Sequence, residues 1–219
     1  MVIEPQWIFL GGGLALVSAV ALAARAAERR RREAYEAHCL MRGFQFEPGR
    51  AEGERPFREF FEPFNQGRRR QWGYTIGGRL HGAPFTAFEY KWVTGGGKNS
   101  STHRINGIVW ERDEPLPTFV LSPEGWFTRL GTVFGMQDID FDESPDFSRA
   151  YRLKGPDEAA IRALFAPQIR QFFAATPDQY VAGGGRFLFW WRSGRLPKAE
   201  QLDAWLEEGD RVRRRFFKE

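Results

Sequence analysis

The chain has 219 residues, of which 42% are hydrophobic and 16% aromatic, and its formal net charge is +4 at pH 7. The first 35 residues hold five Arg and three Glu, a net +2, so the remainder also carries only +2. A dedicated nucleic-acid-binding domain is usually strongly basic, and this charge balance argues against one. Cys39 is the single cysteine, which excludes an intrachain disulfide and is typical of a reducing compartment.

An apolar run extends from Trp7 to Ala24 and is followed by Arg25. If it is taken to residue 27, with Arg25 reaching back to the interface, it has the roughly 20 apolar residues with which an α-helix crosses a bilayer. The pattern predicts a transmembrane anchor over residues 1–27, in contact with lipid through residues 7–27. A juxtamembrane helix over 28–43 and a soluble domain over 44–219 are expected to follow.

Two other interpretations compete with an anchor. A cleaved signal peptide normally carries its positive charge before the apolar run, whereas here the arginines follow it, although the alanine-rich exit would suit a peptidase. A buried core helix is the second alternative. Residues 2–24 contain one ionisable side chain, Glu4, and therefore offer no polar face to solvent.

The orientation of such an anchor is set by positive charge beside the span, which stays on the cytoplasmic side. Five arginines lie just after the apolar run: Arg25, Arg29, Arg30, Arg31 and Arg32. We therefore expect a single-pass protein of the bacterial inner membrane, with its N-terminus outside and its C-terminal domain in the cytoplasm. A stripe of small residues (Gly11, Ala15, Ala19 and Ala23) would allow two such helices to pair as a homodimer.

The rest of the chain predicts an α+β domain. A short amphipathic helix is expected over Phe57–Phe64. Alternating apolar and polar residues separated by short glycine-containing turns then predict antiparallel strands. These strands are Trp72–Leu80, Phe85–Thr94 and Thr102–Glu111, with a further one over Thr118–Leu121. A short helix is expected over Trp126–Phe134.

Helical periodicity returns in the last third of the chain. Residues 157–175 predict an amphipathic helix that Pro167 kinks or splits. Tyr180–Val181 and Arg186–Trp191 predict a hairpin around Gly183–Gly185, and Pro197 opens a final helix. The expected architecture is a transmembrane helix followed by an antiparallel sheet that amphipathic helices cover on one face.

Several short motifs occur in a recognisable order: Tyr90–Asn99 with Thr102-His103, Leu116–Phe119 with Pro123-Glu124, and Asp138–Phe141 running to Phe147–Arg149. On these motifs the chain resembles an uncharacterised family of small bacterial single-pass membrane-anchored proteins with an α+β cytoplasmic domain. The resemblance covers residues 57–195. It implies a bacterial membrane-anchored protein and supplies no catalytic residue and no cofactor.

Three motifs suggest chemistry, and each has a simpler explanation. Lys98 follows three glycines as in a phosphate-binding loop, but Trp92 and Asn99 stand where a Walker loop needs Gly and Ser or Thr. A hairpin turn explains these glycines. His103, beside that turn, is the best candidate for acid–base catalysis. Asp138, Asp140 and Asp142 suggest a divalent-ion loop, although the Gly and Glu that an EF-hand requires are missing.

We therefore expect a membrane-anchored cytoplasmic domain that binds an unknown protein partner, without a cofactor and without nucleic acid. An enzyme with a site near His103 and Asp138–Asp142 is the first alternative. The second alternative is a module that binds anionic lipid surfaces through Arg68–Arg70 and Arg211–Arg215.

Overall fold

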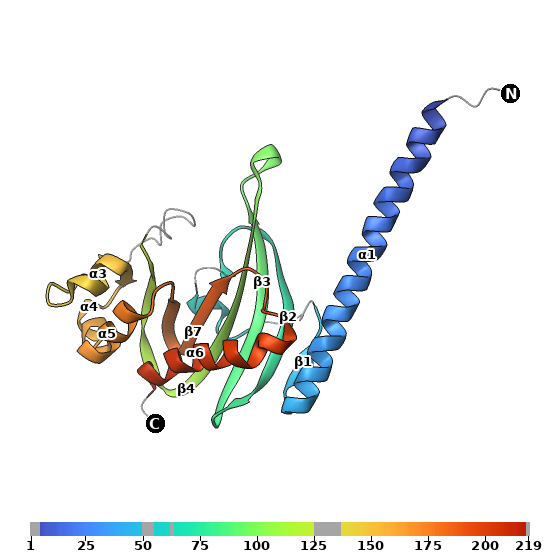
Figure 1. The fold of residues 1–219 in the computed structure, drawn as a ribbon. Helices are drawn as coiled ribbons and strands as arrows, with labels where there is room; N and C mark the ends of the chain where they lie inside the picture. Colours follow the sequence, from blue (N-terminus) through green and yellow to red (C-terminus); the bar gives the residue numbers. More distant parts are fainter. Residues whose placement is uncertain (1–4, 50–54, 62–63, 125–136, 218–219) are drawn as a thin grey trace.

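The computed structural model describes residues 5–49, 55–61, 64–124 and 137–217, and it leaves the side chains of residues 5–16 undescribed (Figure 1). Seven strands in this part of the chain form one antiparallel sheet, in the order β1-β2-β3-β4-β6-β5 with β7 paired to β4. They are β1 (Gln45–Glu47), β2 (Arg68–Leu80), β3 (Ala83–Thr94), β4 (Ser101–Pro123), β5 (Gln137–Asp138), β6 (Tyr151–Gly155) and β7 (Tyr180–Ser193).

The long strand β4 is the spine of the sheet. Its first part, Ser101–Trp110, pairs with β3, and its last part, Val120–Pro123, pairs with β6. β7 pairs with β4 from Ile105 to Leu121, so it occupies the other edge of β4 along most of its length. The two ends of β4 therefore have different neighbours in the sheet, β3 at its start and β6 at its end.

The described helices are α1 (Pro5–Arg42), α3 (Pro145–Ala150), α4 (Glu158–Leu164), α5 (Pro167–Ala175) and α6 (Leu202–Phe216). Short 3₁₀ turns are η1 (Arg58–Phe60), η3 (Gly97–Asn99) and η4 (Ala199–Gln201). The side chain of Asp157 accepts a hydrogen bond from the Ala160 amide and caps α4. Pro167 begins α5, so the helix predicted over 157–175 is split there, as the missing proline amide requires.

The sheet buries both of its faces. On one, which we call the helical face, Ala87, Ile108 and Trp190 belong to the larger core with α6 and the docked part of α1. On the other, which we call the aromatic face, Phe88 and Phe189 belong to a second core that residues 55–61 and Phe64 cover. The predicted α+β class with an antiparallel sheet is confirmed.

β7 differs from the predicted hairpin. It runs through Gly183–Gly185 as one strand paired with β4. The glycines make room for aromatic rings, because a Cβ at Gly183 would lie 2.3 Å from the Phe119 ring and one at Gly185 would lie 2.9 Å from the Phe60 ring. The strand predicted over Thr118–Leu121 is the end of β4. The helix expected over Trp126–Phe134 lies outside the described residues.

The predicted transmembrane anchor is contradicted. Among the helices of the described part, which takes in residues 17–42 of α1, none is both long enough and apolar enough to cross a membrane. Residues 7–16 of the predicted span fall outside the described side chains. From Arg25 onward α1 is rich in charge, and its last third packs against the domain. The predicted inner-membrane location and N-out orientation rested on the anchor and are corrected with it.

Gly107 in β4 tests the close packing of the aromatic face. A Cβ there would lie 2.4 Å from the Phe189 ring and 2.8 Å from the Trp190 carbonyl oxygen. We expect Gly107→Ala to lower the free energy of unfolding by about 1–3 kcal/mol through overpacking, measured by urea denaturation. Gly96→Ala is the control, because Gly96 is extended and nothing lies within 4 Å of its Cβ position. Equal midpoints for the two variants would contradict this packing.

Candidate functional site

α1 docks on the helical face through a narrow stripe. Within residues 17–42 only Arg31, Tyr35, His38 and Cys39 are not exposed, a spacing that places them on one side of a helix. The Tyr35 ring stacks on Phe46 with 5.8 Å between ring centroids, and its hydroxyl donates to the Pro197 carbonyl oxygen. The docked part of α1 therefore bridges the β1 edge of the sheet and the segment before α6.

Four charged side chains and the Tyr74 hydroxyl lie at the N-terminal end of this stripe. We call this group the charge cluster: Glu28, Arg31, Tyr74, Glu89 and Arg195. The Glu89 side chain is only 8% exposed. It accepts hydrogen bonds from the Arg31 guanidinium and, at 2.8 Å, from the Leu196 amide. Glu28 accepts from the Tyr74 hydroxyl at 2.7 Å and from Arg195 Nη2 at 2.9 Å.

The backbone of β2 makes room for this cluster. The β2–β3 register shifts between Trp72 and Thr75, and Gly73 lies in the shift. A Cβ at Gly73 would lie 2.8 Å from Glu89 Cβ, so only glycine allows this approach without displacement. The Arg31 guanidinium also lies over the Tyr74 ring, 4.5 Å from its centroid, which adds a cation–π contact.

The environment favours the charged forms of Glu28 and Arg31. Burial by itself would raise the pKa of Glu28, but the hydrogen bonds from Tyr74 and Arg195 and the charges of Arg195 and Arg31 outweigh it, so the pKa lies below its ordinary value. Burial opposes the charge of Arg31 too, yet Glu89 holds its pKa above the ordinary value. The stabilisation from Glu28 is therefore complete above the ordinary glutamate pKa and is lost as pH falls through the lowered one.

A cavity of about 290 Å³ opens beside the charge cluster. Its lining includes Glu28, Glu89 and Arg195 from the cluster, Lys91 and Arg104 from the polar end of the helical face, and Trp72. Both carboxylates already accept hydrogen bonds from cations or backbone, so neither is positioned as a general base. The arrangement suits ligand binding better than proton transfer.

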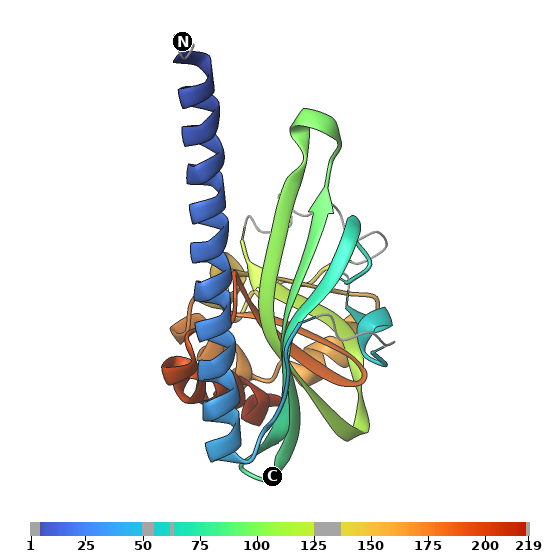
Figure 2. The same ribbon diagram turned by 90° about the vertical axis from the view of Figure 1, so that its right-hand side faces the viewer.

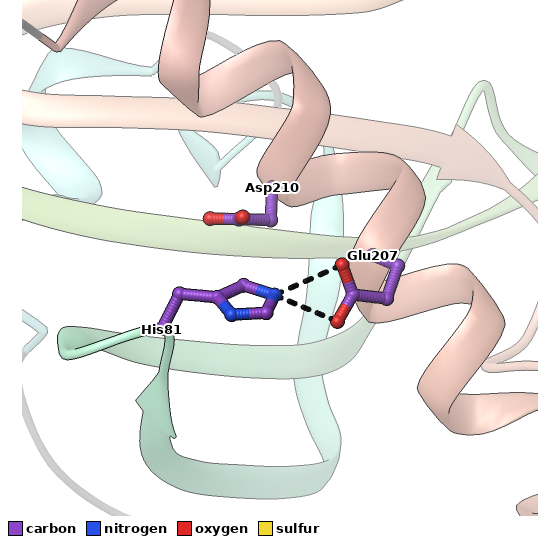
Figure 3. A group of neighbouring side chains, drawn as sticks. All are labelled: His81, Glu207 and Asp210. Atoms are coloured by element: carbon purple, nitrogen blue, oxygen red, sulfur yellow. Dashed lines mark hydrogen bonds and ion pairs between the residues drawn. The ribbon is translucent and has the colours of Figure 1, made fainter.

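A second group of titratable side chains joins the β2–β3 turn to α6 (Figure 3). His81 Nε2 lies 2.8 Å from Glu207 Oε1, and one ligand atom from each of His81, Glu207 and Asp210 falls within 4.8 Å of the others. Two arginines already balance the carboxylates. The Asp210 oxygens lie 2.6 Å from Arg213 Nε and 3.1 Å from Arg214 Nε, although the second contact lacks hydrogen-bond geometry. The positive charge of these two guanidinium groups would repel a metal cation. The His81–Glu207 contact therefore connects the β2–β3 turn to α6 without a metal.

The predicted catalytic and metal-binding residues do not converge. Lys98 is exposed in η3 at the tip of the β3–β4 hairpin, where Gly95 and Gly97 have positive φ as a turn requires. His103 stacks on Trp92 and shares a 2.7 Å hydrogen bond with the Thr94 hydroxyl near the start of β4.

The aspartates lie at the other end of β4. Asp138 in β5 forms ion pairs with Arg152 at 2.8 Å and Lys154 at 3.1 Å, which neutralise it without a metal. Asp140 and Asp142 are exposed. β5 pairs with β6, which pairs with Val120–Pro123, so these aspartates are far along the sheet from His103. The predicted enzyme centre loses the convergence on which it depended.

Three of the five arginines that were assigned to membrane topology form ion pairs. Arg29 and Arg32 form i,i+4 ion pairs with Glu33 and Glu36 on the surface of α1, each at 2.7 Å. Arg31 turns inward to Glu89, whereas Arg25 and Arg30 are exposed. Of the second basic segment, Arg213 and Arg214 pair with Asp210, and Arg215 lies over the Phe172 ring. Arg68–Arg70 are exposed at the start of β2.

No protein-family model matches the chain, and no curated protein matches it. Among solved structures, the chain is similar to the crystal structure of the mycobacterial trehalose monomycolate transport factor A, TtfA, with a TM-score of 0.54. The sequences are 13% identical, and the likeness covers 88% of this chain and 93% of that chain. At this identity the likeness shows a shared fold and nothing about activity. The predicted membership of a bacterial membrane-anchored family stays a prediction.

Because Glu89 is buried in the charge cluster, its substitution is expected to destabilise the fold far more than substitution of an exposed glutamate on α1. Glu89→Ala removes the carboxylate that is hydrogen-bonded to the Arg31 guanidinium, whose side chain is only 18% exposed, and leaves Glu28 at 3.8 Å as its remaining ion-pair partner. We expect a loss of about 3–5 kcal/mol in the free energy of unfolding, the usual cost of breaking a buried ion pair from one side. Urea denaturation followed by tryptophan fluorescence measures it.

Glu33→Ala is the matched control, because it removes a glutamate from an exposed ion pair on the same helix. We expect its urea midpoint to equal that of the wild type within error. If Glu89→Ala behaved like this control, the charge cluster would not hold α1 to the sheet.

Proposed function

We propose that this protein is a binding domain that engages a partner protein through the projecting part of α1. The part of α1 that precedes its docked segment extends well away from the rest of the domain (Figures 1 and 2). Every side chain from residue 17 to residue 30 is exposed. Within this range the hydrogen bonds to the domain begin at Glu28, which accepts from Tyr74 and Arg195. The described part before Glu28, which we call the projecting part of α1, presents a surface for another molecule.

The observation that carries the proposal is where the apolar surface lies. In the described part of the chain, the large hydrophobic side chains that are exposed all belong to α1: Val17, Val20, Leu22, Leu40 and Met41. The rest of the domain buries its large hydrophobic residues in the two cores. An exposed apolar group confined to one element marks an interaction site.

The spacing of these residues indicates the mode of binding. Val17 and Val20 are three positions apart and share one side of the helix, whereas Leu22 points to another side. A partner that covers all three must surround the helix, as a hydrophobic groove does when it receives a helix. The partner's contact surface is therefore expected to be concave and apolar.

Two further observations support a binding role over an enzymatic one. His103 and Asp138–Asp142 lie at opposite ends of β4, and the carboxylates of the charge cluster are paired. In addition, the fold resembles that of a protein named as a transport factor. A second copy of this chain is a partner that the experiment below also detects.

The test replaces apolar surface at two places on the same helix. Val17→Asp with Leu22→Asp should reduce co-purification of a stoichiometric partner from native cells at least about tenfold, because charge opposes entry into an apolar groove. Leu40→Asp with Met41→Asp is the control, since it changes two equally exposed residues next to the docked segment. Mass spectrometry and light scattering read the partner and the oligomeric state.

Circular dichroism should show both double variants folded, because all four side chains are exposed. If the Val17/Leu22 variant retained every partner that the wild type retains, the projecting part of α1 would not be the binding element. Loss of a homo-oligomer in that variant alone would identify the partner as a second copy of the chain.

A further inference from the structure

Two like charges face each other in the β3–β4 ladder. Lys91 and Arg104 are directly paired residues of neighbouring strands, and both are exposed on the polar end of the helical face. No acidic side chain of the residues that the structure describes forms an ion pair or hydrogen bond with either. Like charges directly opposite one another destabilise an antiparallel pair, so this arrangement is favourable only when something neutralises it.

The pair lies at a cavity that is suited to neutralisation by a ligand. Lys91 and Arg104 both line the space of about 290 Å³ beside the charge cluster, together with Arg195 and Trp72. This volume is near the lower end for small-molecule sites. It is large enough for an anionic group and a short attached fragment.

The charges around the cavity do not cancel. Glu28 and Glu89 contribute −2, and their partners Arg31 and Arg195 contribute +2, so the charge cluster is neutral in itself. Lys91 and Arg104 then leave a formal excess of +2 for the cluster and the cavity together, or +1 for the cavity lining alone, which does not include Arg31. A phosphate monoester carries close to −2 at neutral pH, and an arginine beside a lysine provides a planar fork and a compact charge for its oxygens.

We propose that this cavity binds the phosphate group of a small phosphomonoester, with Lys91 and Arg104 as its principal contacts. Arg195 lines the same cavity but is paired with Glu28 at 2.9 Å. It therefore adds positive potential at the cavity and is not a principal contact of the phosphate. This site is separate from the projecting part of α1, and it does not depend on the function proposed for that helix. The bulge at Gly73 keeps the cavity wall free of a side chain between Trp72 and Tyr74.

The experiment uses the full chain and glycerol phosphate as the probe, titrated calorimetrically at constant ionic strength. We expect saturable binding by the wild type. For the double variant Lys91→Gln with Arg104→Gln we expect a dissociation constant at least about tenfold larger. The control is Lys98→Gln with Arg30→Gln, two exposed cations away from the cavity that change the net charge equally. The control should bind as the wild type does.

Folding is checked separately, because removal of the like-charge pair should leave the urea midpoint unchanged or raised. Equal weakening by both double variants would overturn the proposal in favour of unspecific attraction. Absence of saturable binding by the wild type would overturn it as well. Acetate is the competing carboxylate, and displacement of glycerol phosphate by equimolar acetate would overturn the assignment to phosphate.

Discussion

The ion pair between Arg31 and Glu89 is the interaction on which the arrangement of this molecule depends. Glu89 lies in the middle of the sheet, on the same face as the fully buried Ala87, where a lone carboxylate would be costly. Among the described residues, Arg31 of α1 is the one whose guanidinium donates a hydrogen bond to it, whereas Arg195 Nε forms a longer ion pair at 3.8 Å. The sheet therefore requires the docked helix, and the docked helix in turn determines the direction in which the rest of α1 projects.

Much of the fold follows from local patterns. Period-two alternation predicts β2, β3 and the first part of β4 because each strand buries apolar side chains on the sheet, and Pro167 divides its helix because proline lacks the amide that a continuous helix needs. β7 was predicted wrongly, because Gly183–Gly185 look like a turn. Their role is to admit the rings of Phe119 and Phe60, which come from distant parts of the chain.

The site was less predictable for a related reason. Five arginines after an apolar run are a local signal for topology, whereas the partner of Arg31 is 58 residues away in sequence. Alternation along β3 implies only that Glu89 lies on the face opposite Phe88 and Tyr90. It could not show that this face is also covered. His103 and Asp138 looked available because their partners, Thr94 and Arg152, become neighbours only through strand pairing.

Cys39 offers the most direct measurement of this account. Cys39 is 1% exposed on the docked side of α1, and burial raises the pKa of its thiol to about 11. The account predicts that a thiol reagent modifies Cys39 in the native full chain at least about 100-fold more slowly than in the urea-unfolded chain. Glu89→Ala should accelerate the native reaction about tenfold or more, because it weakens docking. Native modification at the rate of the unfolded chain would contradict the account.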